Sequence, residues 1–277
     1  MQKNKLVAPV LKWVGGKRQI MVSIINHLPK KFNHYFEPFA GGAAVLFNLQ
    51  PKNAVINDLN SELINVYKVI KNDVVGLIND LKKHKNEAEY FYQLRSLDRT
   101  EEFKTLTPVQ RASRIIYLNK TCYNGLYRVN NSGEFNSPFG KYRNPNIVNE
   151  PTLKAVSNYL NSNEIQLLNG DYEDALKISD KNSFVYLDPP YHPASERANF
   201  TGYIQGGWDM YDQVRLKTTC DKLNAKGVKF LQSNSAADFI KDLYKEYKIN
   251  IIKANRSINS DGEKRGEVDE LLIQNYE

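Results

Sequence analysis

The spacing of apolar residues along the chain alternates between a strand-like and a helix-like pattern. Short apolar runs that end in polar or glycine-rich segments predict buried strands. These runs are His34–Glu37, Ala54–Ile56, Ile165–Leu168, Phe184–Leu187, Val228–Leu231, Ile249–Ile252 and Glu270–Gln274. Stretches with a 3.6-residue apolar period lie between several of them and predict helices. This alternation is typical of an α/β protein.

The predicted helices differ in how clearly their ends are marked. Thr107-Pro108-Val109-Gln110 is a good helix start, with threonine at the N-cap, proline at the first helical position and glutamine three residues after the cap. Residues 82–104 are rich in charge and predict surface helix and loop. The other predicted helices are the stretch that follows Lys17 and ends at Pro29, Ala43–Leu49, Asn60 to about Lys83, Leu153–Leu160, Asp212–Leu223 and Ala236–Tyr247.

The α/β alternation occupies two separate parts of the chain. It covers residues 1–60 and 151–277, whereas residues 61–150 lack it and form a predicted insertion. Inside the insertion, Leu126–Asn136 predicts a β-hairpin with its turn at residues 130–133. The polar segment Asn255–Glu267 predicts a mobile loop before the last strand.

Composition excludes several classes of protein. Of the 277 residues, 41% are apolar and 25% are charged, which suits a soluble globular chain. The longest apolar runs, such as Ile115–Leu118, are far shorter than the about 20 residues that cross a bilayer, and no basic-then-apolar leader opens the chain. Two isolated cysteines and four scattered histidines predict neither a disulfide framework nor a metal site. We therefore expect a cytoplasmic protein without membrane contact.

Positive charge is concentrated in one part of the insertion. The net charge is +7. Between Arg111 and Arg143 six cations and six tyrosines or phenylalanines accompany a single acid, Glu134. Cations among aromatic rings suit contact with phosphates and stacking on bases. A half-buried aromatic hairpin with a solvated basic face explains the same pattern equally well.

The first predicted strand leads into a glycine turn. Pro38-Phe39-Ala40-Gly41-Gly42 follows that strand, and Asp58 ends the next one. This order matches the first half of a Rossmann-like nucleotide site, in which glycines let backbone N–H groups approach a ligand and the acid accepts from ribose hydroxyls. The string is not G-x-G-x-x-G, so a plain tight turn remains an alternative.

Asp188-Pro189-Pro190-Tyr191 follows the most continuous apolar strand. It is therefore expected at the carboxyl end of a buried sheet, where α/β folds bind ligands. An aromatic amine is a poor nucleophile because its lone pair is delocalised into the ring. Two acceptors, from Asp188 and a neighbouring carbonyl, would free that lone pair, and Tyr191 would hold the ring in line with an electrophile. The alternative is a Pro-Pro turn with a solvated aspartate.

Taken together, these motifs resemble those of the S-adenosylmethionine-dependent DNA adenine-N6 methyltransferases. FEPFAGG at Phe36–Gly42 and VYLDPPY at Val185–Tyr191 are the defining matches. The resemblance extends over nearly the whole chain to the Dam-type branch, which includes GATC methylases of housekeeping and restriction–modification systems. The further matches, in that family's order, are LKWVGGK, IND, YNGLYRVN, GEFNSPFGKY, GDY, QSNS and ELLIQNY.

The resemblance implies a fold, a domain division and a cofactor site. It implies a Rossmann-like methyltransferase sheet, with residues 1–60 and 151–277 as the catalytic S-adenosylmethionine-binding domain. Residues 61–150 would be an inserted helical and β-hairpin domain that recognises the DNA target. No metal is implied. The residues implied to contact or border the cofactor are Trp13, Lys17, Glu37, Phe39, Gly41, Asp58, Asp171, Tyr172 and Asp188.

The resemblance also implies roles at the target base. Asp188 and Pro189, in the motif completed by Pro190, would hold the amine of an adenine flipped out of duplex DNA, and Tyr191 would stack on it. Arg128 would contact a guanine edge, Leu126 a thymine methyl group and Tyr123 the gap left by flipping, and Arg and apolar side chains suit those base edges. The implied DNA contacts are Lys12, Tyr123, Asn124, Leu126, Arg128 and Pro138.

Other functions fit the residues less well. A cytosine carbon-5 methylase needs a Pro-Cys nucleophile, but Cys122 and Cys220 both follow threonine. A nicotinamide dehydrogenase gives no role to the Asp188–Tyr191 motif. A cytosine-N4 or RNA-amine methylase uses similar chemistry, and only the hairpin match argues against it. A non-catalytic DNA-binding protein on the same scaffold would not need Asp188. We therefore expect adenine-N6 methylation, with GATC in double-stranded DNA as the target and another adenine context as the alternative.

Overall fold

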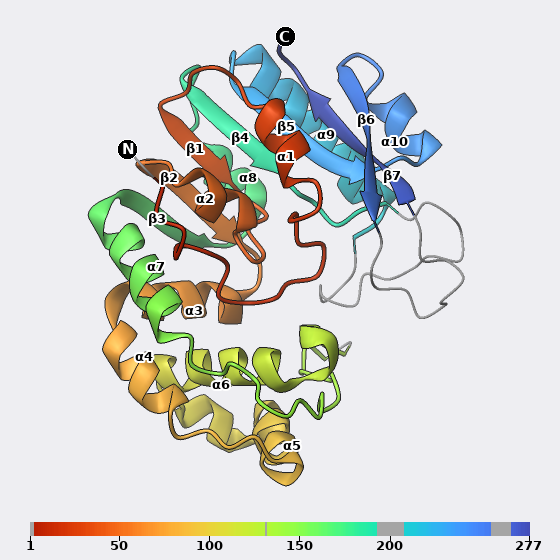
Figure 1. Cartoon of the computed structure of the whole chain (residues 1–277). Coiled ribbons are helices and arrows are strands. Elements are labelled where there is room, and N and C mark those ends of the chain that lie inside the picture. Colours follow the sequence, from red (N-terminus) through yellow and green to blue (C-terminus); the bar gives the residue numbers. More distant parts are fainter. Residues whose placement is uncertain (1–2, 131, 193–207, 256–266) are drawn as a thin grey trace.

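A seven-stranded sheet forms the centre of the molecule in the computed structural model, which describes residues 3–130, 132–192, 208–255 and 267–277 (Figure 1). The strand order is β3-β2-β1-β4-β5-β7-β6. The first five strands in that order are parallel, and β7 is antiparallel to β5 and β6. The strands are β1 (His34–Glu37), β2 (Asn53–Asp58), β3 (Glu164–Asn169), β4 (Ser183–Leu187), β5 (Lys229–Ser235), β6 (Lys248–Asn255) and β7 (Glu267–Gln274). All seven predicted strands are confirmed, although several are longer than predicted.

Helices cover both faces of the sheet because successive strand residues point to opposite sides. Tyr35 and Tyr186 belong to the core under one layer, whereas Phe36 and Val185 belong to the core under the other. The first layer contains α1 (Met21–Asn26), α2 (Ala44–Leu49), α3 (Ser61–Asn72) and α7 (Glu150–Ser162). The second contains α8 (Tyr172–Leu176), α9 (Met210–Ala225) and α10 (Asp238–Leu243). The predicted α/β fold class is confirmed.

Three further helices lie away from the sheet: two pack against α3, and the third, α5, packs against α6 (Figure 1). They are α4 (Val74–Leu81), α5 (Ala88–Ser96) and α6 (Pro108–Thr121), with short 3₁₀ helices η1 (Leu97–Arg99), η2 (Glu101–Thr105) and η3 (Tyr123–Gly125). Helix α3 packs against α6 and also against β2 and β3, so the apolar core continues from the sheet into residues 61–150. The division of the chain at residues 60 and 150 stays a prediction.

Helix ends follow local capping. The predicted start of α6 is confirmed, because Thr107 and Gln110 form a reciprocal capping box. The single helix predicted from Asn60 to about Lys83 is wrong, because the chain breaks at Asp73. The Asp73 carboxylate accepts from Gly76 N at 2.9 Å and starts α4 as a separate helix.

The predicted β-hairpin at Leu126–Asn136 does not form a regular strand pair. Within the described residues its two arms share one isolated bridge, Val129↔Phe135. Hydrogen bonds from Asn130 N to Glu134 O and from Asn136 N to Arg128 O complete the pairing. Polar side chains from neighbouring helices bind the backbone instead, for example Asp98, which accepts from Phe135 N at 2.8 Å. These bonds replace a longer ladder.

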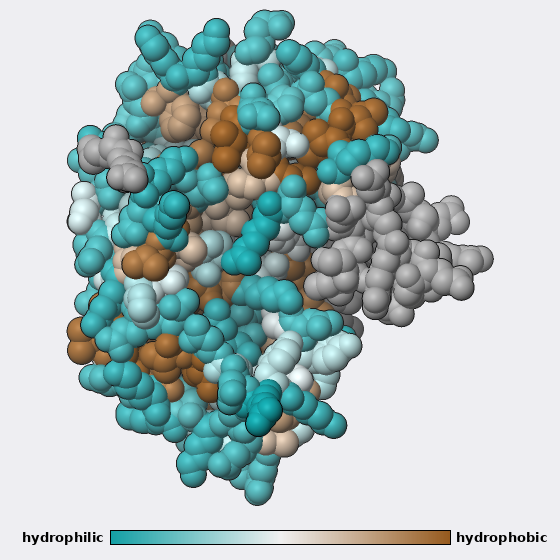
Figure 2. Space-filling model, in the orientation of Figure 1, coloured by the Kyte–Doolittle hydropathy of each residue, from teal (hydrophilic) through white to brown (hydrophobic). Residues whose placement is uncertain are grey.

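The face of the molecule drawn in Figure 2 has no continuous apolar band among its described residues. Figure 2 shows that hydrophilic residues prevail on the face in view and that hydrophobic residues form separate patches. Among the described residues, no helix is both long and apolar enough to span a membrane. The predicted mobile loop at Asn255–Glu267 falls on residues 256–266, which lie outside the described residues.

Candidate active site

Strands β1 and β4 are neighbours in the sheet, and their carboxyl ends bring the two main motifs together. The register pairs Phe36 with Val185, so Glu37 and Asp188 emerge at the same edge. The strand order changes direction here, since β2 lies on one side of β1 and β4 on the other. Ligands of open α/β sheets bind at such a switch point.

One oxygen of Asp188 receives two donors. Lys17 Nζ lies 2.7 Å from Asp188 Oδ1, and Ser233 Oγ donates to the same oxygen at 3.0 Å. The lysine is only 6% exposed and also donates to Gly15 O at 2.6 Å. Burial raises the pKa of Asp188, although the Lys17 ammonium and the Ser233 hydroxyl oppose that shift. Among the described contacts Asp188 Oδ2 has no donor, so it is the oxygen available to a further N–H group.

Tyr191 lies beside the same ammonium group. Lys17 Nζ is 4.8 Å from the centre of the Tyr191 ring, and the Tyr191 hydroxyl donates to Glu270 Oε2 at 3.0 Å. Glu270 is on β7, 79 residues later in the chain. Glu270 is the first residue of the ELLIQNY match, which is its signal in the sequence, but the motif alone implied no role for it.

Glu37 is a second buried carboxyl at this edge. It is 2% exposed, and it accepts from the Tyr35 hydroxyl at 2.9 Å and from Leu46 N at 3.0 Å. Burial raises the pKa of Glu37 from 4.5 to about 8, against the effect of these two hydrogen bonds. Glu37 therefore ties the end of β1 to the first turn of α2.

The glycine turn after β1 has the geometry that a nucleotide site requires. Gly41 has a φ of +48°, and a Cβ added there would lie 2.7 Å from Cδ1 of the Trp13 ring, so only glycine fits without strain. Asp58 Oδ2 accepts from Gly41 N at 2.9 Å, and its Oδ1 accepts from Asn60 N at 2.9 Å. Burial raises the pKa of Asp58, while these backbone donors lower it. The carboxylate thus braces the turn and retains further lone pairs for a hydroxyl group.

An aromatic cluster borders the turn. The Phe39 ring centre lies 5.0 Å from that of Tyr172 and 5.5 Å from that of Trp208. The Trp208 Nε1–H is buried, and within the described part of the chain it has no hydrogen-bond partner. Sequence reasoning missed Trp208, because a single tryptophan before a helix has no distinctive spacing. Flat rings with an unsatisfied donor among them suit a heteroaromatic ring.

Asp171 forms an ion pair with Arg215 of α9. Its two oxygens accept from Arg215 at 2.8 and 2.9 Å, and Oδ1 also caps α8 by accepting from Glu173 N. The Arg215 guanidinium lies 4.9 Å from the centre of the Tyr172 ring. Asp171 and Arg215 therefore support the aromatic cluster from outside.

Residues 12 and 13, which lie beside the glycine turn, are in direct contact with residues 119–127. We name residues 121–139 the recognition segment after the role that the resemblance implies for them. The Trp13 ring stacks on that of Tyr127, with centres 4.5 Å apart and planes at 21°. Asn119 joins the same two parts, since its Oδ1 accepts from Lys12 N at 2.9 Å and its Nδ2 donates to Lys12 O at 2.8 Å and Gly125 O at 3.1 Å. This contact was not visible in the sequence, where the partners lie 107 residues apart.

Tertiary structure gathers the six predicted DNA contacts on the recognition segment and the adjoining Lys12. Tyr123 is 58% exposed, and its N donates to Pro138 O at 2.8 Å. Lys12 is exposed too and passes so close to Gly125 that a Cβ there would lie 2.8 Å from Lys12 Cδ. Pro138 is also exposed. The other three are half-buried: Asn124 with a φ of 58°, Leu126, whose carbonyl accepts from Ser137 Oγ, and Arg128, whose Nε donates to Asn136 Oδ1 at 2.6 Å.

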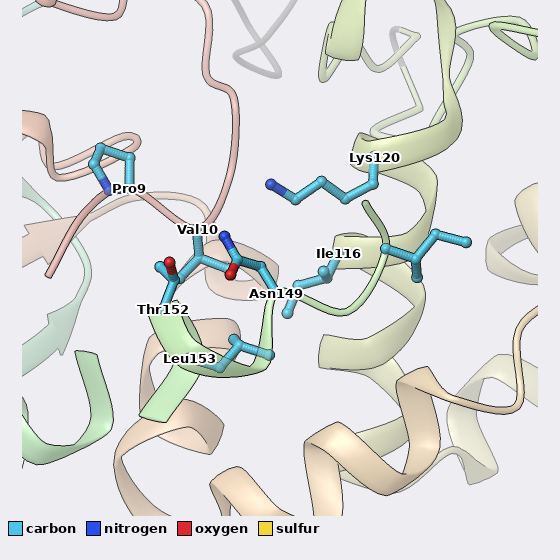
Figure 3. Close-up of a pocket in the computed structure, with 8 residues that line it drawn as sticks. Pro9, Val10, Ile116, Lys120, Asn149, Thr152 and Leu153 are labelled. Carbon is cyan, nitrogen blue, oxygen red and sulfur yellow. The ribbon is translucent and has the colours of Figure 1, made fainter. Parts of the chain in front are cut away.

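Two pockets in the described structure lie apart from this edge. The first, between the N-terminal segment, α6 and α7, measures about 10 Å³, which is room for about one water molecule. Figure 3 shows Lys120 extending toward Val10 there. The second, of about 130 Å³, lies behind the recognition segment beside Arg114. In the part of the chain that the structure describes, no cluster of histidine, cysteine or acidic residues has the form of a metal site.

Comparison with known proteins agrees with this geometry. Residues 13–258 match the family described as D12 class N6 adenine-specific DNA methyltransferase. The chain belongs to that family. It is therefore an enzyme, and the predicted resemblance is confirmed. The matched residues include Trp13, the recognition segment and the Asp188–Tyr191 motif.

Relatives are similar over their whole length. The methyltransferase is 44% identical over 279 residues to the Type II methyltransferase M1.LlaDCHI of Lactococcus lactis subsp. cremoris, covering 100% of this chain and 98% of the relative. It is 42% identical over 290 residues to the Type II methyltransferase M.MjaIII of Methanocaldococcus jannaschii (98% and 99%). It is 35% identical over 277 residues to a DNA adenine methylase of Escherichia coli (98% and 95%). The methyltransferase acts on DNA, at adenine N6, and membership of a methyltransferase family implies S-adenosylmethionine as methyl donor in general.

Proposed function

We propose that the enzyme methylates the adenine of GATC in double-stranded DNA, with S-adenosylmethionine as donor and after flipping the base. One observation carries this proposal: a nitrogen atom, Lys17 Nζ, already lies 2.7 Å from Asp188 and 4.8 Å from the Tyr191 ring centre. The edge of the sheet thus accommodates an N–H donor between a carboxylate and an aromatic ring. The amine of a flipped adenine requires the same two partners.

The residues around the glycine turn fit S-adenosylmethionine. Asp58 would accept from the ribose hydroxyls, and Phe39 and Tyr172 would border the adenine. Beside them lies the Trp208 N–H group, which has no hydrogen-bond partner among the described residues. Glu37 and Asp188 supply acidic groups near a cationic ligand. When bound, S-adenosylmethionine supplies a methyl carbon on a positively charged sulfur. The remaining proposed members of the cofactor site are Trp13, Lys17, Gly41 and Asp171.

The target amine would be held by the chain's own oxygens. Asp188 Oδ2, which has no donor among the described contacts, and the Pro189 carbonyl would accept its two N–H bonds. Neither Pro189 nor Pro190 has an N–H group that could compete. Tyr191 would stack on the base and fix its orientation, and the charge of Lys17 lowers the pKa of Asp188 against the larger, upward effect of burial. The surplus proton leaves easily, because the nitrogen is cationic after transfer.

Recognition would come from one edge of the recognition segment. Arg128 would read a guanine, because arginine pairs with guanine O6 and N7, and Leu126 would contact the thymine methyl group. Tyr123, exposed at the tip, would fill the gap left by the flipped base. Asn124 and Pro138 would line the groove, with Lys12 opposite. GATC follows from the resemblance of these motifs to the Dam-type branch. The domain division at residues 60 and 150 and a cytoplasmic location are parts of the same proposal.

A matched pair of DNA duplexes tests this function. One duplex carries GATC, and the other differs from it by one base pair of that site. Incubation with the enzyme and labelled S-adenosylmethionine should label only the first, and hydrolysis to nucleosides should yield N6-methyl-2′-deoxyadenosine. Equal labelling of both duplexes would contradict the GATC assignment alone. Label in N4-methylcytosine would contradict the proposed target base.

A further inference from the structure

Gln213 on α9 is a fully buried glutamine next to the Asp188–Tyr191 motif, at 0% exposure. Its Nε2 donates to the Pro190 carbonyl at 2.9 Å, and its Oε1 accepts from Asn234 Nδ2 at 3.1 Å. Both ends of the amide are therefore in use. A buried polar side chain is costly unless its hydrogen bonds are made, so this arrangement fixes its orientation.

Asn234 and Ser235, from the QSNS segment of β5, hold the next residue of the same turn. Asn234 Oδ1 accepts from Ser235 N at 2.8 Å and from His192 N at 3.4 Å. Ser235 Oγ donates to His192 O at 2.7 Å. Together with Gln213, these side chains bind three backbone atoms of the turn, which are the oxygen of Pro190 and the nitrogen and oxygen of His192. The QSNS segment thus acts as a frame for the turn.

Proline chemistry explains why such a frame matters. The ring fixes the φ of Pro190, and peptide bonds are planar. The ψ of Pro190 is then the one soft torsion between the Pro189 carbonyl and the Cα of Tyr191. The bond from Gln213 to the Pro190 carbonyl holds this torsion. It therefore sets how the Pro189 acceptor is placed relative to the Tyr191 ring.

We propose that Gln213 is a positioning residue for methyl transfer, which sets the angle between the Pro189 carbonyl and the Tyr191 ring by holding the Pro190 carbonyl. The inference rests on the proposed function of these two groups at the target amine. It does not depend on GATC as the recognition sequence. Gln213 touches no reacting atom and acts through the turn.

Gln213→Leu tests the proposal through the split between kcat and KM. Removal of both hydrogen bonds should lower kcat roughly 10- to 100-fold, because small misplacements of reacting groups have effects of that size. KM for DNA and Kd for S-adenosylmethionine should stay within about twofold of the parent. A variant with parental kcat, or one in which only KM for DNA rises, would overturn the proposal.

Gln213→Glu provides a rescue that a merely structural role would not show. A protonated carboxyl can donate to the Pro190 carbonyl and still accept from Asn234, whereas a carboxylate cannot donate. Burial raises the pKa of such a carboxyl. The ratio of variant to parental kcat should therefore be near one at low pH and fall as pH rises. This variant also keeps the test valid if Gln213→Leu does not fold.

Gln274 offers a matched control. It is 3% exposed, its Nε2 donates to Tyr276 O at 2.8 Å and its Oε1 accepts from Asn250 Nδ2 at 3.4 Å, so it makes the same two kinds of bond. The kcat ratio of Gln274→Glu should not vary with pH. If the ratios of both glutamate variants follow the same pH curve, the Gln213 proposal is wrong.

If the parent methylates adenines outside GATC, only the proposed recognition sequence fails, and the Gln213 measurements can be made on the sequence that it does methylate.

Discussion

The catalytic edge of the sheet and the recognition segment are built in opposite ways. At the edge, Glu37 is the last residue of β1 and Asp188 follows β4, and both strands are hydrogen-bonded to neighbours along their length. The recognition segment has two isolated bridges within the described residues. Side chains from neighbouring helices hold it, among them Asn119, Asp98 and Arg99, each of which binds its backbone.

The difference shows where each region gets its rigidity. A sheet satisfies its own backbone, so side chains at its edge are free to bind ligands. In the recognition segment, borrowed side chains satisfy the backbone, and the residues facing away from those supports remain available for DNA. A change in a support should therefore disturb recognition and leave the chemistry intact, and a change at the edge should do the reverse.

The sharpest test of the edge is Asp188→Ala. Loss of the acceptor should lower kcat roughly 10²- to 10⁴-fold, the range seen when a single catalytic acid–base or polar group is removed. DNA affinity, measured by fluorescence anisotropy, should stay close to that of the parent, because the recognition segment is untouched. Methylation at the parental rate would refute the assignment of Asp188.

Arg114→Leu tests the support of the recognition segment. Arg114 is 2% exposed and lies 2.9 Å from Asp98 Oδ2, and it donates to the carbonyls of Leu94 and Arg95. Removing one partner of a buried ion pair costs about 3–5 kcal/mol of unfolding free energy. Arg111→Leu, on the same helix but paired with Glu62 at a half-exposed position, should cost about 1 kcal/mol or less. Urea denaturation measures both losses, and equal losses of unfolding free energy in the two variants would contradict this distinction.

Glu37→Gln tests the buried acid at the edge. The folded pKa of Glu37 is about 8, above the ordinary 4.5, so its neutral form stabilises the fold at low pH and this stabilisation is lost as pH rises toward 8. The parent should lose unfolding free energy relative to the variant between pH 5 and 8, by at most about 1.4 kcal/mol per pH unit. Urea denaturation of both proteins at four pH values measures this difference in unfolding free energy. A constant difference would show that Glu37 is ionised throughout.

The smallest expected effect belongs to Arg128→Ala. It should weaken discrimination at one base pair by about 1–3 kcal/mol, with little change in kcat on the best site. The measurement compares kcat/KM on duplexes that differ at each position of the site. Arg143→Ala, a surface cation of the same basic stretch, is the control and should affect all duplexes alike. A uniform loss of affinity for Arg128→Ala as well would mean that Arg128 contacts phosphate.

Local patterns in the sequence determined the strands, several helix ends and the two chemical motifs. Apolar runs, the Thr107 capping box and the Asp188–Tyr191 motif depend on residues close together in the chain, so their physics is visible there. The same local rules failed at Asp73, where a side-chain cap ended a helix, and at Leu126–Asn136. In Leu126–Asn136, donors and acceptors from other helices compete with strand pairing. Rules based on neighbouring residues do not include these distant groups.

Only the tertiary structure decided which distant residues meet. The order of the strands places Glu270 at Tyr191, and the packing of α9 brings Gln213 to Pro190. Trp13 lies against Gly41 and stacks on Tyr127, so it connects the glycine turn to the recognition segment. Such contacts depend on strand order and helix packing, which follow from burial of the whole core. A sequence supplies the residues for them without stating which pairs will form.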